Sequence, residues 1–293
     1  MLKRIGLFLL TNLLVVVTVS LIMNIVLPLL GIQVTGGMYG LAIFCGIFGM
    51  SGAFISLAIS RWMAKRAYNI QLIDGTTRDP GAREIYEMVA RLSRKAGLPE
   101  VPEVGIYQAA EPNAFATGPS KSKSLVAFST GLLSSMKREE VEAVAAHEVS
   151  HIASGDMVTM TLLTGVANAL VMFVSRIIAQ FLDSFLRDDE GGGGLGFLGY
   201  IMTVMVLETF LMLLASIPLA AFSRMREYRA DAGAAKYTSP TSMANALKRL
   251  AEAAGMPEKK DSFSMAKISS GKRVSLFATH PSIEDRIARL MRM

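Results

Sequence analysis

Cysteine is almost absent from this chain of 293 residues, because Cys45 is the only one. A single cysteine cannot form an intramolecular disulfide, and it cannot build a metal site that depends on several thiolates. The sequence therefore excludes a disulfide framework, and its cysteine usage does not tie the chain to an oxidising compartment.

Charge is also scarce. Asp, Glu, Lys and Arg make up 18% of the residues, hydrophobic residues make up 52%, and the mean hydropathy is +0.41. Soluble domains carry roughly 25% charged residues, so the composition predicts a membrane protein with the lipid bilayer as a partner. The net charge is +6, but no stripe combines basic with aromatic residues, so no nucleic-acid partner is expected.

Four apolar segments have the length of membrane helices: residues 5–30, 38–59, 157–182 and 195–221. They form two hairpins, and basic residues flank the ends at which the chain enters or leaves them. By the positive-inside rule these ends face the cytoplasm. The flanking residues are Lys3, Arg4, Arg61, Lys65, Arg66, Arg224, Arg226 and Arg229.

Two ionisable residues interrupt the second hairpin. We expect Arg176 to extend its long side chain to the outer interface. Glu208 lies near the middle of its segment, where an acid can mark a functional site. We favour the simpler interpretation, in which Glu208 is protonated or hydrogen-bonded to a neighbouring helix.

The segments outside the hairpins must fold together on one side of the membrane. Apolar periodicity and glycine or proline breaks predict their elements. Helices are expected at 83–96, 137–153, 223–237, 242–254 and 282–291, and strands at 104–107, 114–117 and 125–129, with turns at 118–119 and Gly131.

The chain has three histidines, and two of them stand four residues apart in His147-Glu-Val-Ser-His151. This spacing on a helix points both imidazoles from one face, where they can hold one Zn²⁺. Glu148 is offset by about 100° from His147, so it lies beside the metal. A general base that takes a proton from the attacking water is needed at that place.

A catalytic zinc needs a third protein ligand. The class that supplies a third histidine in HExxHxxGxxH is excluded, because Ser154 and Met157 occupy the glycine and histidine positions. The other class supplies a glutamate from a later helix, and Glu227 is the best candidate. Asp231 lies one turn further on and can orient a ligand imidazole by accepting its N–H.

Together these features predict a mostly α membrane protein with about four transmembrane helices and a cytosolic, zincin-like α+β catalytic domain with a small sheet. The expected organisation is an amino-terminal hairpin, the first catalytic part with the histidine helix, a second hairpin, and the second catalytic part with the third ligand. The corresponding ranges are 1–66, 67–156, 157–221 and 222–293.

Several motifs resemble the HtpX heat-shock membrane protease family along the whole chain. They are HEVSHIASGDMVTMTL, EYRADAGAAK, Asn113-Ala-Phe-Ala-Thr-Gly118 and Thr279-His-Pro281. The resemblance implies an endopeptidase of the bacterial cytoplasmic membrane that takes part in stress response and protein quality control. It also implies one zinc ion held by His147, His151 and Glu227, with Glu148 as the catalytic base.

The resemblance also suggests where a substrate binds. Asn113, Ala114, Phe115 and Ala116 resemble the edge strand that receives an extended peptide in zincins, although a purely structural strand is an alternative. His280 is either a donor that stabilises the oxyanion or a packed or capping residue before Pro281.

The expected reaction is hydrolysis of a peptide bond in unfolded or misfolded membrane proteins. A CAAX-type prenyl protease is an alternative, although that class resembles larger proteins with more spanning helices. A non-catalytic membrane zinc sensor or scaffold is another, because it would use the same ligands without needing Glu148. The chain is a possible homo-oligomer, and its sequence does not define a cleavage preference.

Overall fold

The computed structural model describes residues 13–30, 36–187, 193–253 and 278–293. Its contacts divide the chain into two units. The helical unit comprises Met1–Ser56 and Met160–Leu219, and the mixed unit comprises Leu57–Thr159 and Ala220–Met293. The four-part functional organisation proposed from the sequence remains a prediction.

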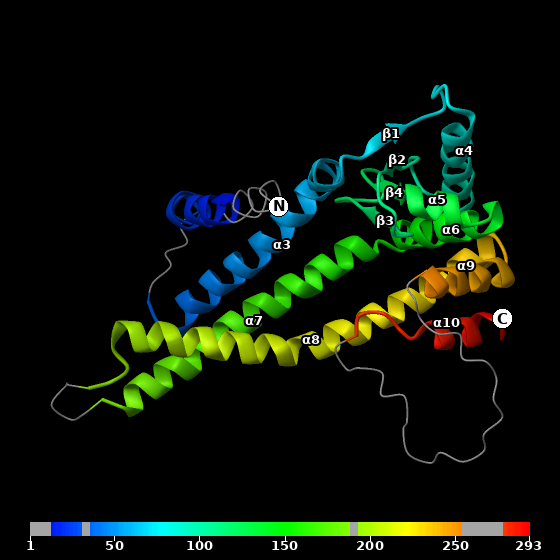
Figure 1. Cartoon of the computed structure of the whole chain (residues 1–293). Coiled ribbons are helices and arrows are strands. Elements are labelled where there is room, and N and C mark those ends of the chain that lie inside the picture. The colour runs from blue at the N-terminus through cyan, green and yellow to red at the C-terminus, as the bar shows by residue number, and fades with distance from the viewer. Residues whose placement is uncertain (1–12, 31–35, 188–192, 254–277) are drawn as a thin grey trace, which may run out of the picture. The chain divides into compact units, whose positions relative to one another are not determined.

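Three helices in the described part of the chain are long and apolar enough to cross a membrane (Figure 1). They are α3 (Met38–Tyr68), α7 (Asp156–Phe185) and α8 (Gly196–Tyr237). At 42 residues, α8 is roughly 63 Å long, about twice the hydrocarbon thickness of a bilayer. It therefore contains both the fourth apolar segment and the helix predicted after it.

The first apolar segment is described only from Leu13, and its residues 5–12 lie outside the described chain. Leu13–Leu29 is a shorter apolar helix, with a π-helical segment η1 at Ile22–Val26 and the helix α2 at Leu27–Leu29. Pro28 has no backbone N–H to donate and its ring crowds the preceding turn. A wider π turn before it accommodates that crowding.

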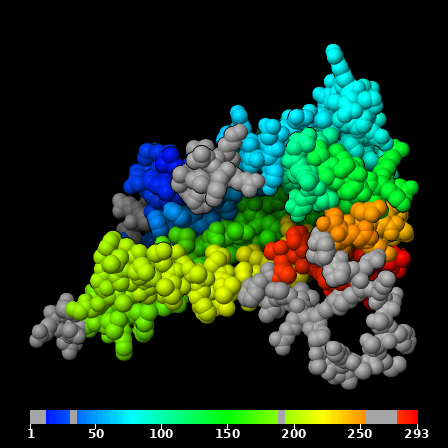
Figure 2. Space-filling view, viewed as in Figure 1, coloured from blue at the N-terminus to red at the C-terminus, as the bar shows by residue number. Residues whose placement is uncertain are grey.

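Large apolar side chains cover the exposed surface of α8 in the helical unit, which is drawn yellow-green in Figure 2. Soluble proteins rarely expose a contiguous apolar surface of this kind, and a lipid environment makes it favourable. The exposed residues include Phe197, Leu198, Met202, Met205, Val206, Phe210 and Leu213.

The structure corrects the expectation for Arg176. Its guanidinium donates to Glu208 Oε1 at 2.6 Å instead of extending alone to the interface. A lone arginine and a lone glutamate would both be costly inside a bilayer, and pairing them reduces that cost. Glu208 is thus bonded to a neighbouring helix.

The mixed unit contains a four-stranded sheet with the order β1-β2-β4-β3. The strands are β1 (Gln71–Ile73), β2 (Glu103–Tyr107), β3 (Ala114–Thr117) and β4 (Leu125–Ser129). Strands β2 and β4 are parallel, and the other pairs are antiparallel. Three of these strands were predicted, whereas β1 is too short to show an alternating pattern. Strand β3 is at one edge of the sheet.

In its described part, the mixed unit also contains five whole helices and the portions of α3, α7 and α8 that fall within it. Helix α6 contacts α4, α9, β3 and β4. The core between them contains Leu92, Phe128, Leu132, Ile152, Met243 and Leu247. The helices are α4 (Pro80–Lys95), α5 (Thr130–Ser135), α6 (Arg138–Ser154), α9 (Pro240–Ala253) and α10 (Ile283–Leu290). The predicted fold class, mostly α with a small sheet and membrane-length helices, is confirmed.

The predicted turn at Gly131 is wrong, because this residue lies inside α5. The Ser129 side chain accepts the backbone N–H of Leu132 at 3.0 Å and so caps the helix. Glycine is required at position 131, because a Cβ there would collide with the backbone of Ala110.

Candidate metal centre and peptide cleft

Helix α6 carries both predicted histidine ligands. It begins after Lys137, whose backbone N–H donates to the Glu140 carboxylate at 2.8 Å. This contact satisfies a free donor at the helix start. His147 and His151 lie on one face, and their Nε2 atoms are 3.1 Å apart.

Helix α8 brings Glu227 to this pair. Gly233 of α8 lies against Ser150 of α6 so closely that a Cβ would overlap the serine side chain, and this approach lets the two helices pack side by side. Glu227 is buried, with 3% of its surface exposed. Its Oε2 is 3.6 Å from His147 Nε2, and its Oε1 is 3.4 Å from His151 Nε2.

The three side chains fit a metal ion. One ligand atom from each can be chosen so that all lie within 4.8 Å of one another. Atoms bound at about 2.0–2.1 Å to a tetrahedral zinc are roughly 3.3 Å apart, close to the observed 3.1–3.6 Å. Two neutral imidazoles and one carboxylate are also a donor set found in catalytic zinc sites.

A carboxylate lies close to the Nδ1 atom of each histidine. Asp231 Oδ1 is 3.0 Å from His147 Nδ1, although the N–H direction is not aligned for a well-formed hydrogen bond. Asp156 Oδ2 is 2.7 Å from His151 Nδ1. The latter contact depends on Gly155, which ends α6 in the left-handed conformation (φ 70°) and turns the chain so that Asp156 begins α7.

Two arginines hold these carboxylates. Arg286 of α10 donates to both Asp231 oxygens at 2.7 and 2.6 Å and lies 3.4 Å from Glu227. Arg229 donates to Asp156 at 2.6 Å. Burial disfavours the charge of Arg286, but Asp231 outweighs this effect and raises the arginine pKa.

The same competition acts on the histidines. Burial disfavours a charged imidazole, but hydrogen bonding to Asp156 and Glu227 outweighs burial and raises the pKa of His151 to about 9. The pKa of His147 is also raised, because Asp231 and Glu227 overcome its burial. The site therefore attracts positive charge, from protons or from a metal ion.

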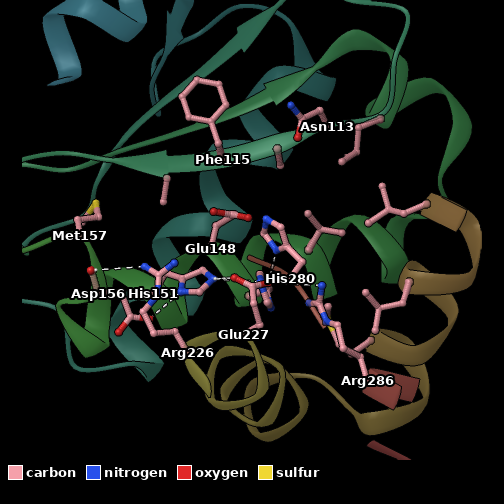
Figure 3. A pocket seen from close by; sticks show the side chains of 18 residues that line it. Asn113, Phe115, Glu148, His151, Asp156, Met157, Arg226, Glu227, His280 and Arg286 are labelled. Carbon is pink, nitrogen blue, oxygen red and sulfur yellow. Dashed lines mark hydrogen bonds and ion pairs between the residues drawn. The ribbon is translucent and has the colours of Figure 1, made fainter. Parts of the chain in front are cut away.

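Glu148 is half-buried and points into a cavity of about 430 Å³ that also borders the histidines. Figure 3 shows its carboxylate on the side of His151 that faces β3. One wall of the cavity is apolar and is formed by Leu132, Val144, Met243, Leu247 and Leu250.

Strand β3 forms another wall of the cavity. Ser129 anchors its start, because the Asn113 backbone N–H donates to Ser129 Oγ and the Ser129 N–H donates to the Asn113 carbonyl, both at 2.9 Å. Ala114 and Ala116 pack against the core. The Phe115 ring points away from Glu148 (Figure 3) and packs on Tyr68 and Tyr107.

His280 also borders the cavity. Its Nδ1 is 3.1 Å from Glu227 Oε2, and 67% of its side chain is exposed. Most of its side chain is therefore exposed at the cavity, next to Glu227 (Figure 3).

Sequence reasoning missed Asp156, Arg229 and Arg286. Asp156 is five residues after His151, but a helix break separates them, so helical periodicity cannot pair them. Arg286 lies far along the chain from Asp231. The sequence signal that could have drawn attention to Asp156 was its charge at the start of an apolar segment.

Membrane-length helices, an HExxH helix and a buried glutamate from a later helix together define a membrane metallopeptidase. The chain belongs to peptidase family M48, whose family model matches residues 81–293. It is 49% identical to "Protease HtpX" of Shewanella sp. (strain MR-4) over 98% of this chain and 99% of that protein. It is 48% identical to the protein of the same name from Shewanella oneidensis, with the same coverage. These matches confirm the resemblance described above.

A solved structure shares the fold. The crystal structure of S. mikatae Ste24p aligns with a TM-score of 0.62, 16% sequence identity, 96% coverage of this chain and 66% of that chain. At this identity the likeness concerns the fold alone.

Proposed function

We propose that this chain is a zinc-dependent endopeptidase of the bacterial cytoplasmic membrane that hydrolyses misfolded or damaged membrane proteins, with its active site facing the cytoplasm. The observation that carries the proposal is the meeting of His147, His151 and Glu227 in a cavity that also holds Glu148. The basic residues that flank the apolar segments support the cytoplasmic orientation.

A zinc ion held by His147, His151 and Glu227 would act as a Lewis acid on water and on the scissile carbonyl. Glu148 has no hydrogen bond to another described side chain, so it is free to accept the proton of the attacking water and pass it to the leaving amine. His280 is placed to donate to the developing oxyanion.

The proposed peptide binds in an extended conformation along the edge strand β3. A free strand edge offers backbone donors and acceptors, which recognise a peptide without regard to most of its side chains. The apolar wall that contains Met243 and Leu247 would take an apolar side chain next to the scissile bond. Asn113, directly before β3, would mark one end of the peptide site.

The decisive comparison uses purified full-length wild type, Glu148→Gln and Glu227→Ala in detergent. We expect wild type to bind one zinc and to cleave casein. Glu148→Gln should keep its zinc but lose cleavage by at least about 100-fold, and Glu227→Ala should lose both. Glu142→Gln is a matched control, because Glu142 pairs with Arg91 and is not among the described residues that line the cavity.

Full cleavage by Glu148→Gln would refute its role as a base. Zinc binding without any cleavage by wild type would favour a sensor or scaffold. Cleavage of a prenylated CAAX peptide but not of casein would instead support the prenyl protease alternative.

A further inference from the structure

Arg226 lines the cavity that contains the metal site, but it has no role in the chemistry described so far. It lies on α8 directly before Glu227 and is half-buried. Figure 3 shows it on the side of the site that holds Asp156 and Met157, away from Asn113. A positive charge is therefore present at one end of the cavity.

Arg226 differs from the other two arginines of the site because it lacks an acidic partner. Arg229 and Arg286 each donate to a buried carboxylate at 2.6 Å. Among the described residues, no carboxylate forms an ion pair with Arg226. Its Nη1 is 3.5 Å from the Asp156 carbonyl, its Nη2 donates to Ser223 Oγ at 3.2 Å, and its Nε is buried without a hydrogen-bond partner. A buried donor without an acceptor is unfavourable, so contacts within the described chain do not explain this guanidinium.

The charge balance of the site calls for an anion next to Arg226. Four carboxylates and three guanidinium groups, including Arg226, surround the two histidines and the cavity. A divalent ion on the ligands would change their excess of about one negative charge into about one positive charge. A carboxylate of the substrate would neutralise this excess, and a guanidinium binds a carboxylate through two parallel hydrogen bonds.

The direction of the bound peptide determines which carboxylate reaches Arg226. Antiparallel pairing with an edge strand is slightly more stable than parallel pairing, so the amino-terminal half of the peptide lies beside the Thr117 end of β3. The apolar wall is at the other end, because the N–H groups of Leu132 and Asn113 both donate to Ser129 Oγ. Arg226 lies away from Asn113 and therefore faces the amino-terminal half. A side-chain carboxylate fits this position, whereas the carboxy terminus of a peptide would lie at the opposite end.

We propose that Arg226 selects peptide substrates that carry an aspartate or glutamate on the amino-terminal side of the scissile bond. Strand β3 has four residues, and a peptide paired with it spans roughly 13 Å, so the acid lies within about three residues of the bond. This inference rests on the proposed function, since it assigns the substrate preference of that peptidase.

The test uses zinc-loaded, full-length protein in detergent and peptides derived from a casein site that wild type cleaves. Each of the positions up to about three residues before the cut carries aspartate, asparagine or lysine in turn. At one of them wild type should cleave the aspartate peptide with about tenfold higher kcat/KM than the asparagine peptide, and the lysine peptide least well. The gain should appear mainly in KM, because the acid is bound in the ground state as well as in the transition state.

Variants of Arg226 assign the preference to this residue. Arg226→Gln should remove the preference for aspartate over asparagine, and Arg226→Lys should keep part of it, because lysine retains the charge but not the planar guanidinium. Arg249→Gln is the matched control: Arg249 lies in the same unit, pairs with Glu252 at 3.1 Å and is not among the described residues that line the cavity. It should keep the full preference. Zinc content is measured in each variant, so that an effect on the metal is recognised.

A second measurement depends neither on turnover nor on the folding of Arg226 variants. Zinc-loaded Glu148→Gln should bind a fluorescent aspartate peptide about tenfold more tightly than the asparagine form, as read from fluorescence anisotropy. A photo-crosslinking residue at the aspartate position should label Met157 or Arg226. Labelling of Asn113 instead would overturn the proposal.

The remaining outcomes separate this proposal from the proposed function. A wild type that binds zinc but does not cleave casein would refute the peptidase itself. A wild type that cleaves casein but does not distinguish the three peptides would refute the role of Arg226 alone. A preference that survives Arg226→Gln, or one for acids on the carboxyl-terminal side of the cut, would also overturn it.

Discussion

Asp156 offers the sharpest test of how the metal site is built, because it is almost fully buried and has two short charged contacts. Its Oδ2 is 2.7 Å from His151 Nδ1, and its Oδ1 accepts from Arg229 at 2.6 Å. In Asp156→Asn the shape is kept. One contact must nevertheless fail, because the amide NH₂ would face either the histidine N–H or the arginine.

The size of the effect follows from these contacts. A hydrogen bond to a charged group contributes about 1.5–3 kcal/mol, which corresponds to roughly a 10- to 100-fold change in an equilibrium constant. Loss of an outer carboxylate typically weakens metal binding by a similar factor. We expect Asp156→Asn to bind zinc about 10- to 100-fold more weakly. Arg229→Met should have a smaller effect, because 55% of the Arg229 side chain is exposed.

Zinc affinity is measured by competition with a chromophoric chelator, and casein cleavage is followed at saturating zinc. Much of the lost activity should return when zinc is added in excess, because the ligands themselves are intact. Asp183→Asn is the control, since Asp183 pairs with Arg187 at 2.7 Å but lies in the helical unit. A zinc affinity of Asp156→Asn within twofold of wild type would refute the reasoning.

Three other perturbations test different parts of the fold. Gly233→Leu should destabilise the protein by about 1–3 kcal/mol through overpacking against Ser150 and release zinc; unchanged thermal melting would contradict the close helix approach. In metal-stripped protein the folded pKa of His151, about 9, exceeds its ordinary value of 6.5. Its stabilisation, at most about 3 kcal/mol, should be complete below pH 6.5 and lost as the pH rises through 9; denaturant unfolding that does not change over this range would be inconsistent with the assignment. Arg176→Leu should destabilise the helical unit more than the double change with Glu208→Leu, because it leaves an unpaired acid; a double-mutant cycle without coupling would show that the pair contributes nothing.

The sequence is most informative where chemistry and periodicity coincide. Two histidines at helical spacing with an intervening Glu148 predict a metal-binding face before any contact is known. Apolar length predicts the spanning segments in the same direct way. The prediction of Glu227 did not come from periodicity. It came from the need of a catalytic zinc for a third ligand, which directed attention to the acids on later helices.

The remaining features depend on tertiary contacts that sequence spacing does not encode. Arg176 pairs with Glu208 across two helices, and neither residue indicates its partner. Helix α5 begins at a serine cap and continues through Gly131, although glycine favours a turn in isolation. The close contact of Gly131 with the Ala110 carbonyl outweighs the preference of glycine for a turn.

Charge balance connects these observations. Asp156, Asp231 and Glu227 surround the histidine pair, and Glu148 faces the same cavity. Arg229 and Arg286 contact these acids and Arg226 lines the same cavity, so the four acids and three arginines leave an excess of about one negative charge around the site. Burying that excess is unfavourable. Protons on the two histidines can neutralise it, in line with their raised pKa values, and a divalent ion can do so without blocking Glu148. A bound metal ion would therefore neutralise the negative charge at this site as well as supply its chemistry.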